Sequence, residues 1–273
     1  MLSIFSWFGY RKLTHTEEFR LIKQAGFDCV LLWWDDDFDG PAFRLQPELA
    51  RREGLFVENV HANFGRANHL WEDTLEGQGV CEYYLQCLED CAAFEIPAIV
   101  MHASYGEAPP ASEIGLRRFA RLIEHAERNN VNIALENMRR ASQIKEAAFL
   151  LERFDSPRLG MCFDSGHHHA RLLRTQDADL LARFGHRLMA LHLHDNHGTI
   201  TESNSADEHL LPFDGTIDWP DQMRKIAETG YRGPTTLEVE NGGYENVPPE
   251  EFLALAYERA KRLEALRNGA NNQ

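Results

Sequence analysis

The chain has 273 residues, which suits one large domain, and 43% of them are hydrophobic, enough for a sizeable core. Its 28 basic and 43 acidic residues give a net charge of −15, which disfavours binding to nucleic-acid phosphates and anionic membranes. No run of about 18 apolar residues predicts a membrane span, and the amino terminus does not have the pattern of a signal peptide. The five cysteines match no zinc-finger spacing, so we expect a reduced, cytoplasmic protein.

Short apolar runs alternate with longer amphipathic runs along the chain. The expected strands are 2–8, 29–34, 55–61, 98–102, 132–136, 159–164, 188–194 and 235–240. The expected helices are 16–25, 47–53, 80–95, 113–129, 144–153, 177–184, 219–229 and 249–266. Strands that alternate with helices indicate parallel βαβ units, and eight such units in this length predict an α/β fold, a (β/α)8 TIM barrel, as a single domain over residues 1–273. An open doubly wound sheet is the alternative, but no glycine-rich phosphate loop follows the first strand.

The third to eighth expected strands each end in a residue that can bind a metal ion. These residues are His61, His102, Glu136, Asp164, His192 or His194, and Glu238 or Glu240. The carboxyl ends of TIM-barrel strands meet at one face, and chemistry takes place there. One such residue alone would be read as structural. Six in succession predict a divalent cation, which would neutralise the carboxylates and use the imidazoles.

Two choices in this pattern stay open from the residues alone. Side chains two residues apart on a strand point to the same face, so His192 and His194 are equal candidates, as are Glu238 and Glu240. The loop after the seventh strand adds Asp207 and His209, which alone would be read as part of a solvated loop. Together with His167 they could hold a further metal ion or bind a substrate hydroxyl.

Three segments resemble the xylose isomerase-like TIM-barrel superfamily, which includes sugar isomerases and epimerases, inosose-processing enzymes and the endonuclease IV group. The sequence FDSGH at 163–167 looks like the family's Asp-x-x-His, and LHLHDN at 191–196 looks like its His-x-x-Asp. Residues 207–219 look like the loop that follows. The resemblance runs from about the third strand to the eighth, and its strength lies in the order and spacing of the three segments.

The resemblance implies four core metal ligands: Glu136, Asp164, His192 and Glu238. It selects His192 because the family's ligand is the histidine three residues before the aspartate, and it favours Glu238 over Glu240. Relatives of endonuclease IV bind three zinc ions through further ligands. The matching positions here are His61, His102, His167, Asp207 and His209.

The resemblance also implies a divalent-metal-dependent isomerase or epimerase of a sugar, a sugar phosphate or an inosose-type polyol, with Zn, Mn, Co or Mg as the ion. We expect Glu136 and Glu238 to move the proton through an enediolate. Ketohexose epimerases have an arginine after the strand-seven histidine, whereas residues 196–199 here are NHGT, so the sugar is open. Dehydration of an inosose is open as well.

Two other functions stay in view. One is an endonuclease IV-like zinc phosphodiesterase acting on abasic DNA, which the net charge of −15 disfavours. The other is a non-catalytic sugar-binding barrel, which the complete set of core ligands disfavours. The expected partner is a small carbohydrate substrate, with neither nucleic acid nor membrane, and a homo-oligomer is compatible with the sequence.

Overall fold

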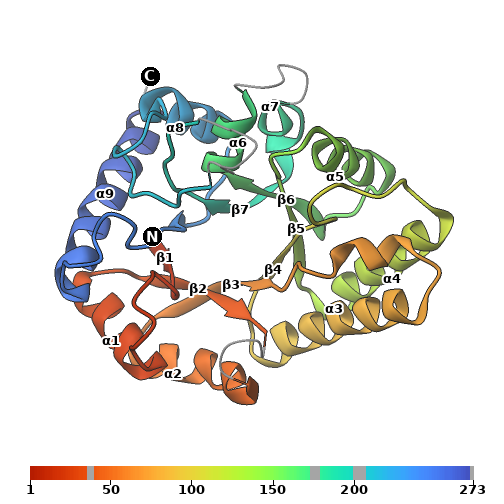
Figure 1. Ribbon diagram of the computed structural model, residues 1–273, viewed down its shortest axis with the longest axis horizontal. Helices are drawn as coiled ribbons and strands as arrows, with labels where there is room; N and C mark the ends of the chain where they lie inside the picture. The colour runs from red at the N-terminus through yellow and green to blue at the C-terminus, as the bar shows by residue number, and fades with distance from the viewer. Residues whose placement is uncertain (36–39, 173–178, 199–206, 271–273) are drawn as a thin grey trace.

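The computed structural model describes residues 1–35, 40–172, 179–198 and 207–270. Its strands are β1 (Leu2–Phe5), β2 (Cys29–Trp34), β3 (Phe56–Ala62), β4 (Ala98–Met101), β5 (Asn132–Glu136), β6 (Leu159–Asp164), β7 (Leu188–His192) and β8 (Thr235–Leu237). They form one sheet in the order β7-β6-β5-β4-β3-β2-β1-β8, with each neighbouring pair parallel. The two edges meet where Leu193 bridges Leu237, and the Leu193 N–H donates to the Thr236 carbonyl at 2.9 Å. The predicted (β/α)8 barrel is therefore confirmed (Figure 1).

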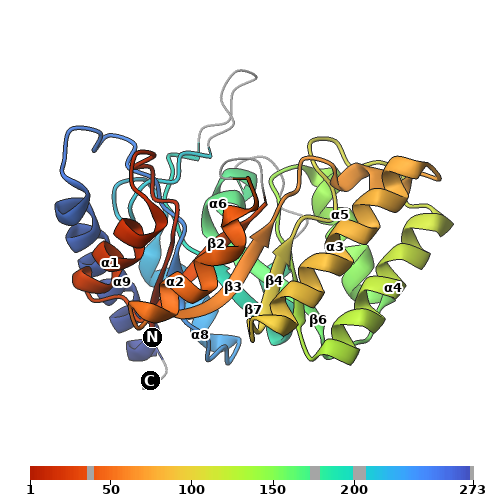
Figure 2. The same ribbon diagram turned by 90° about the horizontal axis from the view of Figure 1, so that it is seen from below.

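Helices surround the strands, as the side view shows (Figure 2). They are α1 (His15–Ala25), α2 (Gln46–Arg52), α3 (Leu75–Ala93), α4 (Glu113–Asn129), α5 (Ala141–Arg153), α6 (Ser165–Leu172), α7 (Leu180–Phe184), α8 (Trp219–Glu228) and α9 (Pro249–Ala270). Short 3-10 helices span Gly40–Leu45, Ala67–Trp71 and Gly185–Arg187. Within the described ranges, none of the helices combines the length and apolarity needed to cross a membrane.

The helix ends follow from local capping chemistry. Thr14 and Glu17 form a reciprocal capping box at the start of α1, and Gly26 ends that helix in the left-handed region at φ 112°. Ser112 accepts a hydrogen bond from the Gly115 N–H at the start of α4, at 3.1 Å. Such caps satisfy backbone groups that have no partner inside the helix, so these boundaries could be predicted from the sequence.

The largest departure from the expected elements is α6, which begins directly after β6. The carboxylate of Asp164 accepts a hydrogen bond from the His167 N–H at 2.6 Å and so satisfies the first turn. The segment carries serine, glycine and three histidines, with no apolar period to predict a helix. The helix expected at 177–184 begins at Leu180 in the structure, and residues 177–178 lie outside the described part.

Residues on the inner face of the barrel determine where the candidate site lies. A small buried cluster on β4 to β7 is separate from the main core between strands and helices, and it consists of Val100, Ala134, Cys162 and Ala190. Two residues beyond these four positions stand His102, Glu136, Asp164 and His192. Because side chains two apart share a face, the polar groups lie directly above the small apolar ones. The six candidate strand ends thus meet at the carboxyl end of the barrel.

Candidate metal centre

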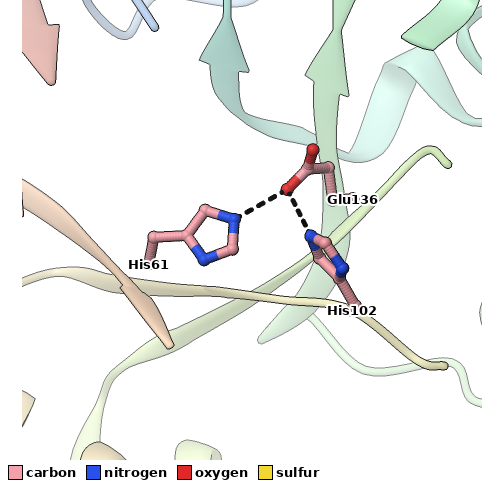
Figure 3. A group of neighbouring side chains, drawn as sticks. All are labelled: His61, His102 and Glu136. Atoms are coloured by element: carbon pink, nitrogen blue, oxygen red, sulfur yellow. Dashed lines mark hydrogen bonds and ion pairs between the residues drawn. The ribbon is translucent and has the colours of Figure 1, made fainter. Parts of the chain in front are cut away.

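Glu136, the last residue of β5, lies at the centre of a group of imidazoles. One of its carboxylate oxygens is 3.1 Å from Nε2 of His61 and 3.1 Å from Nε2 of His102 (Figure 3). The first oxygen, Oε2, is also 3.5 Å from Nδ1 of His192. The other oxygen, Oε1, is 3.1 Å from Nδ1 of His167. Glu136 is only 2% exposed. A buried carboxylate needs charge compensation, and these imidazoles or a cation between them could supply it.

The four predicted core ligands come together. Glu136, Asp164, His192 and Glu238 each present one ligand atom within 4.8 Å of the others, and all four are buried. Nδ1 of His192 is 3.2 Å from the carboxylate of Glu238. Neither ring nitrogen of His192 makes a hydrogen bond of normal geometry with any described residue. Buried nitrogens without hydrogen bonds are costly. A divalent ion would bind the lone pair of a His192 ring nitrogen, so the residues fit a metal site.

Three further groups of potential ligands share residues with this core or adjoin it, and one of them joins His61 to His192 and Glu238. His61 and His102 form a group with Glu136, which also belongs to the core. His194, Asp207 and His209 form another group, in which Asp207 is 3.8 Å from His194 and 3.4 Å from His209. The additional candidates are thus brought to the same end of the barrel as the core.

His167 connects the two parts of the site. Its Nδ1 faces Glu136, as described above, and its Nε2 is 3.3 Å from the carboxylate of Asp207. The sequence placed His167 with Asp207 and His209, and the geometry agrees. The ring therefore lies between the core and the group formed by His194, Asp207 and His209.

The choice between His192 and His194 is not exclusive in the structure. His192 lies in the core, whereas Nε2 of His194 is 3.2 Å from Asp164, and its ring stacks on that of His209 with 4.1 Å between centroids. The alternation of side chains along the strand predicted both residues as candidates. Only the family resemblance favoured His192 over His194. Glu240 differs: it is half-buried and belongs to none of the potential ligand groups among the described residues.

Electrostatics separate the charges within the site. Burial alone would raise the pKa of Glu136, but His102 and His192 hold it well below its usual range. Burial likewise disfavours protonated His194, yet Asp164 raises its pKa to about 9. Asp207 is held well below its usual pKa by His167, against the effect of burial. The carboxylates of Glu136 and Asp207 are therefore ionised, and His194 favours its protonated form; a bound cation would compete with such protons.

Asp195 holds the loop that carries Asp207 and His209. It is fully buried. Its carboxylate accepts hydrogen bonds of 2.8–3.1 Å from the backbone N–H groups of Asn196, Phe213 and Ile217 and from the Trp219 indole. Its backbone pairs with Leu210 through two bonds, at 2.9 and 3.1 Å, next to His209. The motif reading used Asp195 only to locate His192. Its structural role was missed because its carboxylate binds Phe213, Ile217 and Trp219, which lie 18 to 24 residues away.

Comparisons with known proteins concern the family and the fold of the chain. A family profile described as xylose isomerase-like TIM barrel matches residues 19–263. The protein y4fM of Sinorhizobium fredii is 30% identical over 283 residues, covering 90% of this chain and 87% of that protein.

Solved structures show the same fold at lower identity. A D-tagatose 3-epimerase-like protein superposes with a TM-score of 0.72 at 20% identity, covering 98% of both chains. The IOLI protein, whose structure contains a zinc atom, has a TM-score of 0.72 at 16% identity and covers 99% of both chains.

Proposed function

The chain belongs to the xylose isomerase-like TIM-barrel family, and on this basis we propose that it is a divalent-metal-dependent isomerase or epimerase of a sugar or a related cyclic polyol. The observation that carries the proposal is the buried group of Glu136, Asp164, His192 and Glu238, whose ligand atoms lie within 4.8 Å of one another. Two structural neighbours, a D-tagatose 3-epimerase-like protein and the zinc-containing IOLI protein, support the same chemistry.

The core residues would hold the ion through three carboxylates and one imidazole. When bound, a divalent cation would supply Lewis acidity, which polarises a carbonyl and makes the neighbouring carbon more acidic. Mixed oxygen and nitrogen donors accept zinc, manganese, cobalt or magnesium, so the ion is left open within this set.

The two glutamates are proposed to move the proton. Glu238 has the less crowded carboxylate, because its contact within the core is with His192, whereas both oxygens of Glu136 face imidazoles. Glu238 would remove the proton between the carbonyl and the adjacent hydroxyl. Glu136 would return a proton that it receives from the protonated imidazole of His167, 3.1 Å away. The enediolate formed in between leads to an isomer or an epimer, depending on the carbon and the face that receive the proton.

His102 is proposed to orient the substrate. Its Nε2 contacts Glu136, and its Nδ1 is buried without a hydrogen-bond partner among the described residues. Burial lowers the pKa of His102 and so favours the neutral ring, whereas the Glu136 carboxylate opposes this effect. A neutral imidazole can donate to or accept from a substrate hydroxyl, which this free nitrogen would do.

Interconversion of ketoses provides the test of this proposal. Protein loaded separately with manganese, cobalt, magnesium or zinc is incubated with a panel of ketoses and inososes, and products are separated by chromatography. We expect turnover that chelation abolishes and that Glu238→Gln lowers by at least a hundredfold. Glu240→Gln is the matched control because Glu240 is outside the ligand groups found among the described residues, and it should retain activity. Full activity in Glu238→Gln would contradict the assignment.

A second candidate function rests on the additional ligand groups. His61 and His102 with Glu136, and His194 with Asp207 and His209, could hold two ions besides the core one, as a zinc phosphodiesterase acting on abasic DNA would require. The net charge of −15 opposes DNA binding. Three zinc ions per chain by elemental analysis, together with cleavage of an abasic duplex, would favour this function over the first.

A non-catalytic sugar-binding barrel would bind ketoses without converting any of them. A small carbohydrate as substrate is part of the proposed isomerase or epimerase function. Cytoplasmic location and a homo-oligomeric state stay predictions.

A further inference from the structure

A pocket opens at the same end of the barrel as the proposed metal centre. It has a volume of about 470 Å³ and is lined by segments that follow β1 and β2 together with the starts of α1 and α2. The described residues that line it include none of the candidate ligands. One liquid-water volume is roughly 30 Å³, so the pocket has room for roughly fifteen waters, comparable with the heavy atoms of one sugar ring.

Trp33 joins this pocket to the metal centre. Its indole lines the pocket and also stacks on His61, with 5.4 Å between ring centroids and 28° between planes. His61 in turn contacts Glu136 at 3.1 Å. A ligand in the pocket would therefore be separated from Glu136 by the stacked rings of Trp33 and His61. Such a position suits the distal part of a substrate whose reacting carbons lie over Glu136 and Glu238.

The lining favours an uncharged ring with many hydroxyl groups. Trp7 and Trp33 offer flat apolar surfaces, which pockets for small molecules commonly combine with a few polar groups. Gln46 is 3% exposed, and its amide nitrogen donates to the Trp33 carbonyl at 3.3 Å. Its amide oxygen is buried and accepts no hydrogen bond from any described residue. Leaving such an acceptor unsatisfied is costly, and a ligand hydroxyl would satisfy it.

The charges of the lining distinguish a polyol from a phosphate. Glu18 and Asp35 add two carboxylates to the pocket. Glu18 contacts His15 at 2.9 Å, and the Arg11 guanidinium lies over the Trp7 ring at 5.4 Å. An anion would meet these carboxylates and the acceptor of Gln46, whereas hydroxyl groups can donate to all three.

We propose that this pocket is a specificity subsite for a second, unphosphorylated sugar or polyol ring, so that the substrate is a glycoside-sized ketose. The inference rests on the proposed isomerase or epimerase function for its reacting end. The subsite itself is independent of the metal, because its lining residues and its acceptor are separate from the ligand group.

Binding to metal-free protein tests the subsite apart from the chemistry. The probes are isomaltulose, a glucosyl-fructose, and fructose 6-phosphate, each titrated in the presence of EDTA and followed by tryptophan fluorescence and calorimetry. We expect saturable binding of isomaltulose that is at least tenfold tighter than that of fructose 6-phosphate. Gln46→Leu should weaken isomaltulose at least tenfold. Gln222→Leu on α8 is the matched control: its buried amide nitrogen also has no partner among the described residues, but it does not line this pocket, and it should bind normally.

The outcomes separate the two proposals. Three results would overturn the subsite. They are equal binding of isomaltulose by wild type and Gln46→Leu, tighter binding of fructose 6-phosphate than of isomaltulose, or no saturable binding of isomaltulose. Isomaltulose binding without any metal-dependent conversion would uphold the subsite and count against the enzyme function. With metal restored, the subsite also predicts that Gln46→Leu raises KM for isomaltulose and leaves KM for D-fructose unchanged.

Discussion

Replacement of Glu146 by glutamine should change how the stability of the barrel depends on pH. Glu146 lies on α5, is 7% exposed, and neither of its carboxylate oxygens has a hydrogen bond of normal geometry with a described residue. Burial raises its pKa from 4.5 to about 7, and the nearby Ser104 hydroxyl offsets part of that effect. The fold therefore favours the neutral acid, and ionisation at higher pH opposes folding.

The size and sign of the effect follow from linkage. The difference between 4.5 and about 7 corresponds to about 3 kcal/mol at 1.36 kcal/mol per pH unit. Because the folded-state pKa is raised, this stability is fully present below about pH 4.5 and is lost as pH rises through about 7. Glutamine does not titrate, so Glu146→Gln should gain about 3 kcal/mol relative to wild type between pH 4.5 and pH 8.

Urea unfolding at closely spaced pH values measures this difference. Glu152→Gln is the control on the same helix, since the Glu152 side chain is 57% exposed, and its curve should parallel that of the wild type. If the free energies of unfolding of Glu146→Gln and wild type stay parallel across this range, the burial argument for Glu146 is refuted.

Other perturbations address the site itself. A Cβ at Gly166 would lie 2.0 Å from the His194 ring, so Gly166→Ala should displace that imidazole and lower activity at least tenfold with a folded barrel, as circular dichroism would show. Asp207→Asn removes charge from the outer group and should lower the metal content by elemental analysis only if an ion binds there; an unchanged content would leave the core as the metal position. Removing the ion should lower Tm by on the order of 10 °C if it is present at about a thousand times its Kd, and an unchanged melting curve after chelation would count against tight binding.

The barrel could be predicted because each βαβ unit carries its own local signal. The strand 132–136 and the helix 113–129 coincide with β5 and α4, since apolar periods and caps act within a few residues. The six strand-end candidates followed from the same logic, because strand ends converge in this fold, whereas the choice of four core ligands came from the family resemblance. By contrast, β8 ends at Leu237 and not at residue 240. The Glu238 N–H still donates to the Leu193 carbonyl at 3.1 Å, but the Glu240 N–H donates to His209, which lies on the loop after β7, at 2.9 Å.

The features that were missed depend on contacts distant in sequence. The helix α6 is an exception, because its cap is local: Asp164 accepts from the His167 N–H, but the segment has no apolar period to predict a helix. Asp195 organises a loop whose partners lie far along the chain, and the pocket beside Trp33 forms only when the segments after β1 and β2 are brought together. No periodic pattern records such pairings, so the side chains beyond the core could be proposed as candidates but not placed.

Proton exchange is the most direct test of the central claim that the buried carboxylate–imidazole group supports metal-dependent proton transfer. Wild-type protein and Glu136→Gln are incubated in D₂O with each divalent ion and a panel of ketoses and inososes, and deuterium at the carbon beside the carbonyl is followed by NMR. We expect wild type to incorporate deuterium only with metal, and Glu136→Gln to lose this exchange. Absence of exchange with every ion and substrate, or equal exchange in the variant, would contradict the account.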